Sequence, residues 1–311
     1  MRVVTDDEVR FFTPSYIPYF QALETAGIAV KDDGRDQSIM HSKYFIIDGS
    51  IVWTGSTNQS DNGYTLNHNS AIAFTSPSVA ALYQQDFDQM WAGSFSVNKI
   101  ASTTTATTYN GNSLEVYFSP KNNAMNEVIA EVNAAQSTIE FAIFFFTDSA
   151  LKDALIAAKN RGVQIRGLWD SLGKASPFSM DEALCAAGIP IKIEDTAGKM
   201  HHKFMVIDAA GSDPRTVTGS MNWTGAGDEA NDESTIIYRD SAISLAYTAG
   251  FQTMWDALNA STQCEITPVK IRCWTGVPKL ALGFLRIFIL GAVPQAESVS
   301  SLYRISPNGI R

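Results

Sequence analysis

One pattern occurs twice in this 311-residue chain, and it constrains the fold more than any other feature. The segment MHSKYFIIDGSIVWTGSTN at 40–58 is matched by MHHKFMVIDAAGSDPRTVTGSMN at 200–222. Shorter matches flank both copies, namely RVVTD with RGLWD at 2–6 and 166–170, and DFDQMW with GFQTMW at 86–91 and 250–255. Self-similarity of this extent predicts two related structural units within one chain.

The second copy has the pattern of a complete α/β unit. Apolar segments at 114–119, 138–146 and 163–169 predict strands, and helical spacing at 122–136 and 148–160 predicts helices between them. Asp148 is a suitable N-cap and Gly162 follows the end of its helix. The segments 203–208 and 215–220 indicate two adjacent strands joined by a turn. This alternation predicts a layered domain whose helices cover a sheet.

The first copy is shorter than the second. Met1 aligns with Ile165, inside a predicted core strand, so the first copy lacks about 50 residues counted from Leu114. We therefore expect a chain truncated at its N-terminus, or one whose start was placed too late. An export signal would lie in that missing piece. The compartment stays open, with periplasmic or extracellular export as the preferred expectation.

These observations divide the chain into four parts. Residues 1–100 form the first repeat, 101–112 a small, polar linker, 113–262 the second repeat and 263–311 a C-terminal extension without a counterpart. The apolar segment 279–296 in that extension is interrupted by Arg286 and is short for a membrane span. A core-packing helix, an interfacial helix and an out-of-frame tail all remain open for it.

The repeated histidine and lysine are the candidate chemical groups. On an extended segment His201 and Lys203 point to one side, and the same spacing recurs at His41 and Lys43. One such pair alone would suit a solvated strand edge. Two copies, each followed by a matching Gly-Ser-x-Asn segment, favour a shared site instead.

Such a shared site would suit a phosphodiester. Lysines and the amides of Asn58 and Asn222 would neutralise the nonbridging oxygens, most strongly in the transition state. One imidazole would attack phosphorus while the other protonates the leaving alcohol. This chemistry requires no metal, and the sequence shows no further His/Cys/Asp cluster with ligand spacing.

The paired HxKxxxxD motifs, each followed by GSxN, resemble those of the phospholipase D superfamily over about residues 1–260. The resemblance implies an α/β fold, a duplicated α-β-α sandwich of two pseudo-twofold-related domains with the site at their interface. The first of these domains would be incomplete. It also implies a covalent phosphohistidine that is transferred to water or to another alcohol, with no cofactor and no metal.

The resemblance assigns roles to individual residues. His41 and His201 would be nucleophile and general acid/base, with His41 preferred as the nucleophile. The other assignments are phosphate binding by Lys43, Lys203, Asn58 and Asn222, support from Ser56 and Ser220, and a structural role for Asp48 and Asp208. His202 lies outside the motif and is expected either to pack or to contact the residues that bind the substrate.

The resemblance also predicts a difference between the two histidines. The family has an acidic residue thirteen positions after the motif serine, which is expected to orient the histidine of its own half. Glu233 fills this place behind His201, whereas the first copy has Asn69. A carboxylate raises the basicity of its histidine and an amide only orients it, so the two pKa values should differ.

The substrate follows less directly. A net charge of -9, a pI of about 4.9 and the lack of Lys/Arg runs oppose a nonspecific nuclease. Aromatic residues near the motifs would line a lipid entrance or belong to the core: Trp53, Tyr64, Trp169, Phe178 and Trp223.

We therefore rank a phospholipid-hydrolysing phospholipase D first, an endonuclease second and a phospholipid-transferring, cardiolipin-synthase-like enzyme third. The expected partners are a phospholipid or other phosphodiester and a transient membrane surface, with nucleic acid as the second choice. The oligomeric state stays open. An inactive fragment with unpaired sheet edges is the alternative of another class.

Overall fold

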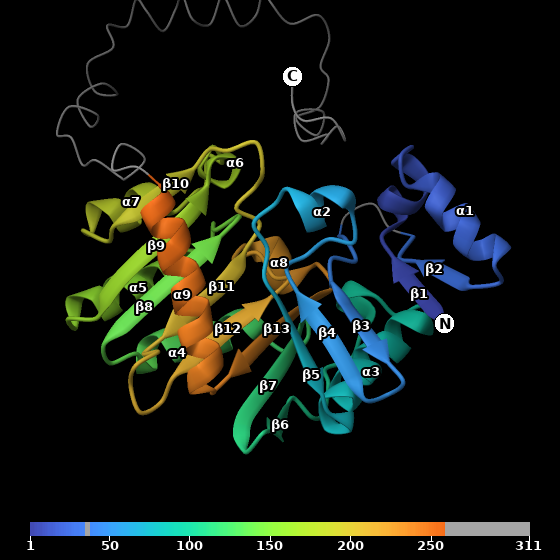
Figure 1. The fold of residues 1–311 in the computed structure, drawn as a ribbon, viewed down its shortest axis with the longest axis horizontal. Helices are drawn as coiled ribbons and strands as arrows, with labels where there is room; N and C mark the ends of the chain where they lie inside the picture. The colour runs from blue at the N-terminus through green and yellow to red at the C-terminus, as the bar shows by residue number, and fades with distance from the viewer. Residues whose placement is uncertain (35–37, 259–311) are drawn as a thin grey trace, which may run out of the picture. The chain divides into compact units, whose positions relative to one another are not determined.

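The computed structural model describes residues 1–34 and 38–258, so the predicted C-terminal extension at 263–311 lies outside the described residues. These described residues form one compact unit that contains both repeats (Figure 1).

The second repeat contributes most of an eight-stranded mixed sheet with the order β10-β9-β8-β11-β12-β13-β7-β6. β8, β9 and β10 are parallel, and every other neighbouring pair is antiparallel. The strands are β6 (Ala106–Tyr109), β7 (Asn112–Ser119), β8 (Thr138–Ile143), β9 (Gln164–Asp170), β10 (Ile191–Glu194), β11 (Lys203–Ile207), β12 (Arg215–Gly219) and β13 (Glu233–Tyr238).

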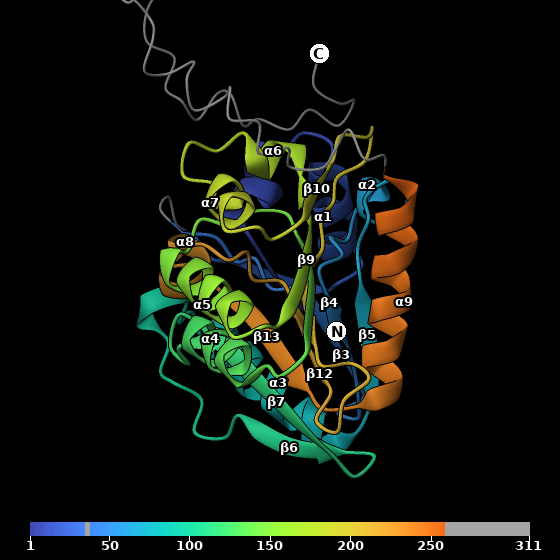
Figure 2. The ribbon, with the colours of Figure 1, turned by 90° about the vertical axis from the view of Figure 1, so that its left-hand side faces the viewer.

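Helices cover both faces of this sheet (Figure 2). On one face lie α4 (Ala124–Ala134), α5 (Ser149–Asn160) and α7 (Asp181–Ala186), and on the other lies α9 (Ser241–Ala257). Asp148 caps α5 by accepting a 2.7 Å hydrogen bond from the Leu151 amide, as its sequence predicts. The second repeat is therefore an α-β-α sandwich.

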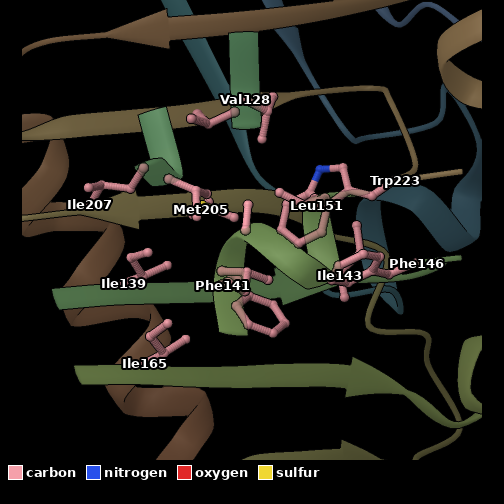
Figure 3. Packing of buried hydrophobic residues seen from close by; sticks show 14 of the residues in the cluster. Val128, Ile139, Phe141, Ile143, Phe146, Leu151, Ile165, Met205, Ile207 and Trp223 are labelled. Carbon is pink, nitrogen blue, oxygen red and sulfur yellow. The ribbon is translucent and has the colours of Figure 1, made fainter. Parts of the chain in front are cut away.

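The main core lies between the sheet and the α4/α5 layer. Phe141 of β8, Met205 of β11 and Trp223 are almost completely buried there, together with Val128 and Leu151 from the two helices (Figure 3). Burying an apolar side chain of this size stabilises a fold by roughly 1.5–3 kcal/mol. The apolar strand at 138–143 thus forms the centre of the second repeat, with a neighbour on each side.

The first repeat contains two separate sheets. β1 (Arg2–Thr5) and β2 (Ala29–Asp32) form a parallel pair, and β3 (Tyr44–Ile47), β4 (Ile51–Gly55) and β5 (Ala71–Thr75) form an antiparallel sheet. Repeat matching makes β1 the counterpart of β9 and β3 the counterpart of β11. In the second repeat β8 lies between those two strands. The first repeat is therefore divided where the counterpart of β8 would lie.

Its helices are α1 (Ile17–Thr25), α2 (Asp61–Thr65) and α3 (Pro77–Trp91), and a π-helical turn at Glu8–Phe12 precedes α1. α3 covers the β3-β4-β5 face that carries Tyr44 and Ile46. On the opposite face Phe45 and Ile47 are 47% and 46% exposed. Their counterparts Met205 and Ile207 are fully buried beneath α4 and α5. Within the part of the chain that the structure describes, this β-sheet of the first repeat thus has a helix layer on one face only.

The predicted linker at 101–112 is partly a strand. β6 lies within it and pairs antiparallel with β7 at the edge of the large sheet. The Tyr109 ring packs edge-on against Phe74 at 5.2 Å between centroids and also contacts Tyr238. The small, polar residues of this segment do not predict a strand. The contacts of a single aromatic residue, Tyr109, hold the segment at the sheet edge.

Candidate active site

The two HxK segments meet through backbone hydrogen bonds between the repeats. The His41 amide donates to the Asp232 carbonyl over 2.9 Å, and the His201 amide donates to the His68 carbonyl over the same distance. Parallel bridges join Met40 to Asp232 and His68 to Met200. Each histidine is consequently placed by a segment of the other repeat that lies just before a strand.

The imidazole partners follow the same crossed arrangement. His41 Nδ1 lies 2.7 and 2.8 Å from the two carboxylate oxygens of Glu233. His201 Nδ1 lies 3.0 Å from Asn69 Oδ1 and 3.0 Å from the Ser56 carbonyl. The prediction that Glu233 orients the histidine of its own half is therefore wrong. The bridge at Asp232 brings the next residue, Glu233, against His41 instead.

Hydrogen bonds around Asn69 fix its amide. Asn69 Nδ2 donates to the Gly63 carbonyl over 2.9 Å, which leaves Oδ1 to face His201. The Ser56 hydroxyl donates to the same Oδ1 over 2.9 Å. A proton on His201 Nδ1 satisfies both acceptors there, so Nε2 carries the reactive lone pair.

Ser220 has the matching role in the second repeat. Its hydroxyl accepts from the Ser234 amide over 3.0 Å and hydrogen-bonds the side chain of Glu233. Both motif serines therefore hold the acceptor that faces a histidine. Their predicted support of the site acts through Asn69 and Glu233.

The motif glycines allow this close approach. Gly55 and Gly219 have φ values of 146° and 148°. A Cβ at either position would lie 2.2 Å from the Ser70 carbonyl oxygen or 2.0 Å from that of Ser234. Only glycine lets the motif turn pass so close to the next strand.

The two motif lysines are buried and each contacts its own histidine. Lys203 Nζ donates to the His201 carbonyl over 2.8 Å, and Lys43 Nζ donates to the His41 carbonyl. Burial lowers the pKa of Lys43 to about 8. Burial and the charge of Lys43 lower the pKa of Lys203 well below its usual range. A bound anion would relieve both effects, as expected of a phosphate site.

The histidines are electrostatically coupled across the repeats. Burial, followed by the charges of Lys203 and Lys43, lowers the pKa of His201 well below its usual range. Burial also lowers the pKa of His41, but the charge of Glu233 opposes that effect. Burial would raise the pKa of Glu233, but the charge and hydrogen bond of His41, together with Lys43 and Ser220, lower it overall. The carboxylate thus favours imidazolium at His41, the reverse of the predicted order.

The two motif asparagines lie directly after the glycine-serine turns. Asn58 precedes α2, which is capped by Ser60, and Asn222 precedes α8 (Gly225–Glu229), which is capped by Thr224. Asn222 Oδ1 is buried and has no hydrogen-bond partner among residues 1–34 and 38–258. A polar atom left in this way is available to a ligand.

The two motif aspartates lie in different surroundings. Asp208 accepts hydrogen bonds from the Gln136, Ser137 and Thr138 amides and from the Ser137 hydroxyl, at 2.7–2.9 Å. Burial alone would raise its pKa, but these bonds outweigh burial and lower it. Asp48 is exposed at the end of β3. The structural role predicted for both is thus visible at Asp208.

Two further residues at the site escaped the repeat comparison. The Phe144 ring lies 5.0 Å from the His201 ring, with Lys203 Nζ and Lys199 Nζ at 4.9 and 5.5 Å from its centroid. Lys199 shares the alternating spacing of His201 and Lys203, which was an available signal. It was overlooked because the first copy has Ile39 there.

His202 and the aromatic candidates differ in how deeply they are buried. His202 is buried against Phe204, and burial lowers its pKa to about 3, in accord with the predicted packing role. Trp169 and Trp223 belong to the core. The exposed aromatic side chains among the candidates are Tyr64 at 60% and Phe178 at 73%, while Trp53 is half-buried beside Phe45.

One acidic cluster was also missed. Asp6, Asp7 and Asp33 have ligand atoms within 4.8 Å of one another, although Asp33 is distant in sequence. Burial and the charge of Asp33 raise the pKa of Asp6 to about 6. Asp33 accepts hydrogen bonds from the Asp7 and Met40 amides at 2.9 Å. Asp33 thereby links the segment that carries Asp7 to Met40, the residue before His41.

The fold and site define a duplicated α/β protein with one His-Lys-Asn set from each half. Residues 1–91 and 128–255 match the family described as "Cardiolipin synthase, PLD-like domain". The chain belongs to this family of the phospholipase D superfamily.

Similar proteins include two curated relatives. A protein named mitochondrial cardiolipin hydrolase from Xenopus laevis is 31% identical over 139 residues, which cover 45% of this chain and 64% of that protein. A Rickettsia bellii protein named phospholipase D is 30% identical over 130 residues, covering 42% and 63% respectively. The chain thus spans less than two thirds of the length of either relative.

Solved structures show the same fold at low identity. Phosphatidylserine synthase from Haemophilus influenzae superposes with a TM-score of 0.65 and 12% identity, covering 93% of this chain and 81% of that chain. Polyphosphate kinase from Porphyromonas gingivalis has a TM-score of 0.57 and 12% identity, covering 85% and 39%. At such identities the likeness concerns the fold alone.

Proposed function

We propose that this protein is a phosphodiesterase of the phospholipase D type, which hydrolyses the headgroup ester of a phospholipid through a phosphohistidine. The observation that carries the proposal is the crossed pair of imidazoles. Glu233 holds His41 and Asn69 holds His201, each through Nδ1, beside two buried lysines. The names of the curated relatives support a phosphodiester substrate.

In the first step His41 Nε2 attacks phosphorus, and the bond from phosphorus to the leaving alcohol breaks. The protonated His201 gives its Nε2 proton to the leaving oxygen. Positive charge develops on the His41 ring, where the Glu233 carboxylate stabilises it. His201 faces an amide and a carbonyl instead, which makes its imidazolium the stronger acid.

In the second step His201 removes a proton from water, and the resulting hydroxide attacks phosphorus. The phosphorus–nitrogen bond breaks, which releases a phosphate monoester and restores neutral His41. Lys43, Lys203 and the amides of Asn58 and Asn222 neutralise the nonbridging oxygens in both steps. An anionic phosphate also raises the pKa of His201 toward the range in which it can carry a proton.

A lipid is favoured over a nucleic acid by charge and by surface. The net charge of -9 opposes binding that rests on many phosphate contacts. Phe178, which precedes α7, and Tyr64 on α2 expose most of their apolar rings, as expected of a transient membrane contact. Among the described helices, none combines the length and apolar character needed to cross a bilayer.

An activity panel tests this proposal. The protein is assayed with EDTA present on phosphatidylcholine and cardiolipin vesicles and on single-stranded DNA. We expect phosphatidate-type products from lipid, and a loss of at least about 10³-fold in His41→Asn and His201→Asn with unchanged melting temperatures. Enzyme denatured in alkali should carry phosphorus on His41, because the phosphorus–nitrogen bond survives alkali but not acid.

The other outcomes identify the alternatives. Cleavage of DNA without lipid would assign the nuclease reaction, and a product joined to added glycerol rather than water would assign lipid transfer. Near-normal turnover in either histidine variant would refute the two-histidine site. Complete inactivity of a well-folded wild-type protein would identify the chain as an inactive fragment.

A further inference from the structure

Lys199 points to a feature of the substrate beyond the scissile phosphate. We propose that Lys199, with His68 beside it, forms a subsite for a second phosphate of the substrate, on the side of His201. The site would then prefer a phospholipid with two phosphates to one with a single phosphate. This inference rests on the proposed phosphodiesterase function and specifies its substrate class.

Lys199 belongs to the active-site surroundings. Its carbonyl accepts hydrogen bonds of 2.8 Å from both the His201 and the His68 amides. Its Nζ lies 5.5 Å from the Phe144 ring, and that ring lies 5.0 Å from the His201 imidazole. The Lys199 charge is also among the causes that lower the pKa of His201. The ammonium is thus close enough to act on a ligand held by His201.

Lys199 is half-buried, and its ammonium faces the ring of Phe144. This ammonium makes no hydrogen bond or ion pair with the part of the chain that the structure describes. Other buried lysines differ, since Lys99 pairs with Asp86 at 2.7 Å and Lys192 donates to the Trp255 carbonyl at 2.6 Å. Burial lowers the pKa of Lys199, and the charge of Asp170 only partly opposes it. An anion bound beside this ammonium would oppose the effect of burial.

The position of Lys199 breaks the symmetry of the site. The scissile phosphate is surrounded by matching groups, with one histidine, one lysine and one asparagine from each repeat. Lys199 corresponds to Ile39 in the first repeat, so it has no symmetric counterpart. A lysine without a counterpart in the other repeat can bind a part of the substrate that lies on only one side of the scissile phosphate. The proposed role of His201 makes this the side of the leaving group.

His68 adds a second donor to the same side. Its half-exposed imidazole is held through Nδ1 by the buried Glu194 at 3.0 Å, which leaves Nε2 for a ligand. The counterpart of His68 is Asp232, which is buried. Near His201 the site therefore has Lys199 and His68. The matching positions near His41 are Ile39 and the buried Asp232.

The spacing suits two phosphates rather than one. Two residues of extended chain cover roughly 6–7 Å, so Lys199 and Lys203 lie on opposite sides of His201 along the segment. Phosphates joined by a short polyol have a similar separation. Successive phosphates of a nucleic acid do as well, but the net charge of -9 and the lack of basic runs favour the lipid.

Lys199→Gln tests the subsite, with Lys159→Gln as the matched control. Lys159 lies in the last turn of α5, beside the N-terminal ends of β8 and β9 and away from the histidines. The substrates are cardiolipin with two phosphates, phosphatidylglycerol with one, and bis(p-nitrophenyl) phosphate as a minimal diester. Both lipids are presented in the same neutral detergent micelles.

We expect Lys199→Gln to lower kcat/KM on cardiolipin about tenfold, mainly through KM, and to change the two single-phosphate substrates less than about twofold. His68→Gln should act in the same direction with a smaller effect. Lys159→Gln should leave all three substrates unchanged. Equal losses on one and two phosphates would refute the subsite, because Lys199 would then serve the scissile phosphate alone.

A nucleic-acid arm completes the test. If Lys199→Gln impairs cleavage of a single-stranded oligonucleotide more than cleavage of cardiolipin, the lipid subsite is overturned. Wild-type protein that cleaves no phosphodiester, including bis(p-nitrophenyl) phosphate, would refute the proposed function together with the subsite. Wild-type activity with equal losses would refute the subsite only, so the two failures are distinguishable.

Discussion

The two repeats have the same motif in different structural settings. In the second repeat β8 joins β9 to β11, and helices cover both faces of the sheet. In the first repeat the counterpart sheets are separate, and no helix among residues 1–34 and 38–258 covers the Phe45 face of β3-β4-β5. His41 and His201 are nevertheless held alike, because each takes its partner from the other repeat. Cross-repeat contacts, rather than the completeness of either repeat, therefore place the reactive groups.

The largest contrast should be found in the core. Met205→Ala leaves a cavity under α4 and α5 and should lower the free energy of unfolding by about 2–5 kcal/mol. Phe45→Ala at the matching position removes a half-exposed ring, so we expect a loss below about 1 kcal/mol. Urea unfolding followed by far-UV circular dichroism measures both. Equal losses would show that the face carrying Phe45 is covered in solution.

The motif aspartates should differ next. Asp208→Asn replaces an acceptor of four hydrogen bonds and should cost roughly 1–3 kcal/mol of stability at neutral pH. Asp48→Asn at the exposed position should cost less than about 0.5 kcal/mol. Matched urea titrations give both values, and a large loss at Asp48 would contradict the contrast.

The Asp208 contribution also depends on pH in a defined direction. Its folded pKa lies below the unfolded value, so its contribution is complete above the unfolded pKa near 4 and is lost as pH falls through the folded pKa. Stability of the wild-type protein should fall toward acid more steeply than that of Asp208→Asn. Parallel acid dependence of the two proteins would show that Asp208 is not the group responsible.

The smallest contrast concerns the two orienting residues. Glu233→Gln gives both histidines an amide partner and should lower kcat about tenfold, because the charge on the His41 ring loses its carboxylate. The pKa of His41 falls, so the acidic limb of the pH-rate profile moves to lower pH. The measurement is kcat against pH on a phosphodiester. An unchanged acidic limb would reject His41 as the group that must be neutral.

The reverse exchange sharpens this result. Asn69→Asp places a carboxylate beside His201 Nδ1 and raises the pKa of His201, so the alkaline limb of the profile should move to higher pH. The change in kcat should stay within about threefold, because the geometry of the acceptor is retained. A shift of the acidic limb instead would exchange the roles of the two histidines.

Much of the fold could be read from local patterns. Spacing and side-chain chemistry were enough to predict the apolar strand at 138–143, the cap at Asp148 and the adjacent strands β11 and β12. β6 could not be read, because Thr107 and Thr108 suit a loop as well as an edge strand. The anchoring contact of Tyr109 with Phe74 joins positions distant in sequence.

By itself, the sequence determined the duplication, the paired HxK and GSxN segments and the superfamily. A repeated spacing of residues can be recognised without knowing which residues are in contact. Only the tertiary structure decided which acceptor faces which histidine. Glu233 and Asn69 lie thirteen residues after the serines of their own repeats. The bridges at Asp232 and His68 nevertheless place each of them beside the histidine of the opposite repeat. Partner choice depends on how strands meet between the halves, and linear spacing carries no information about that meeting.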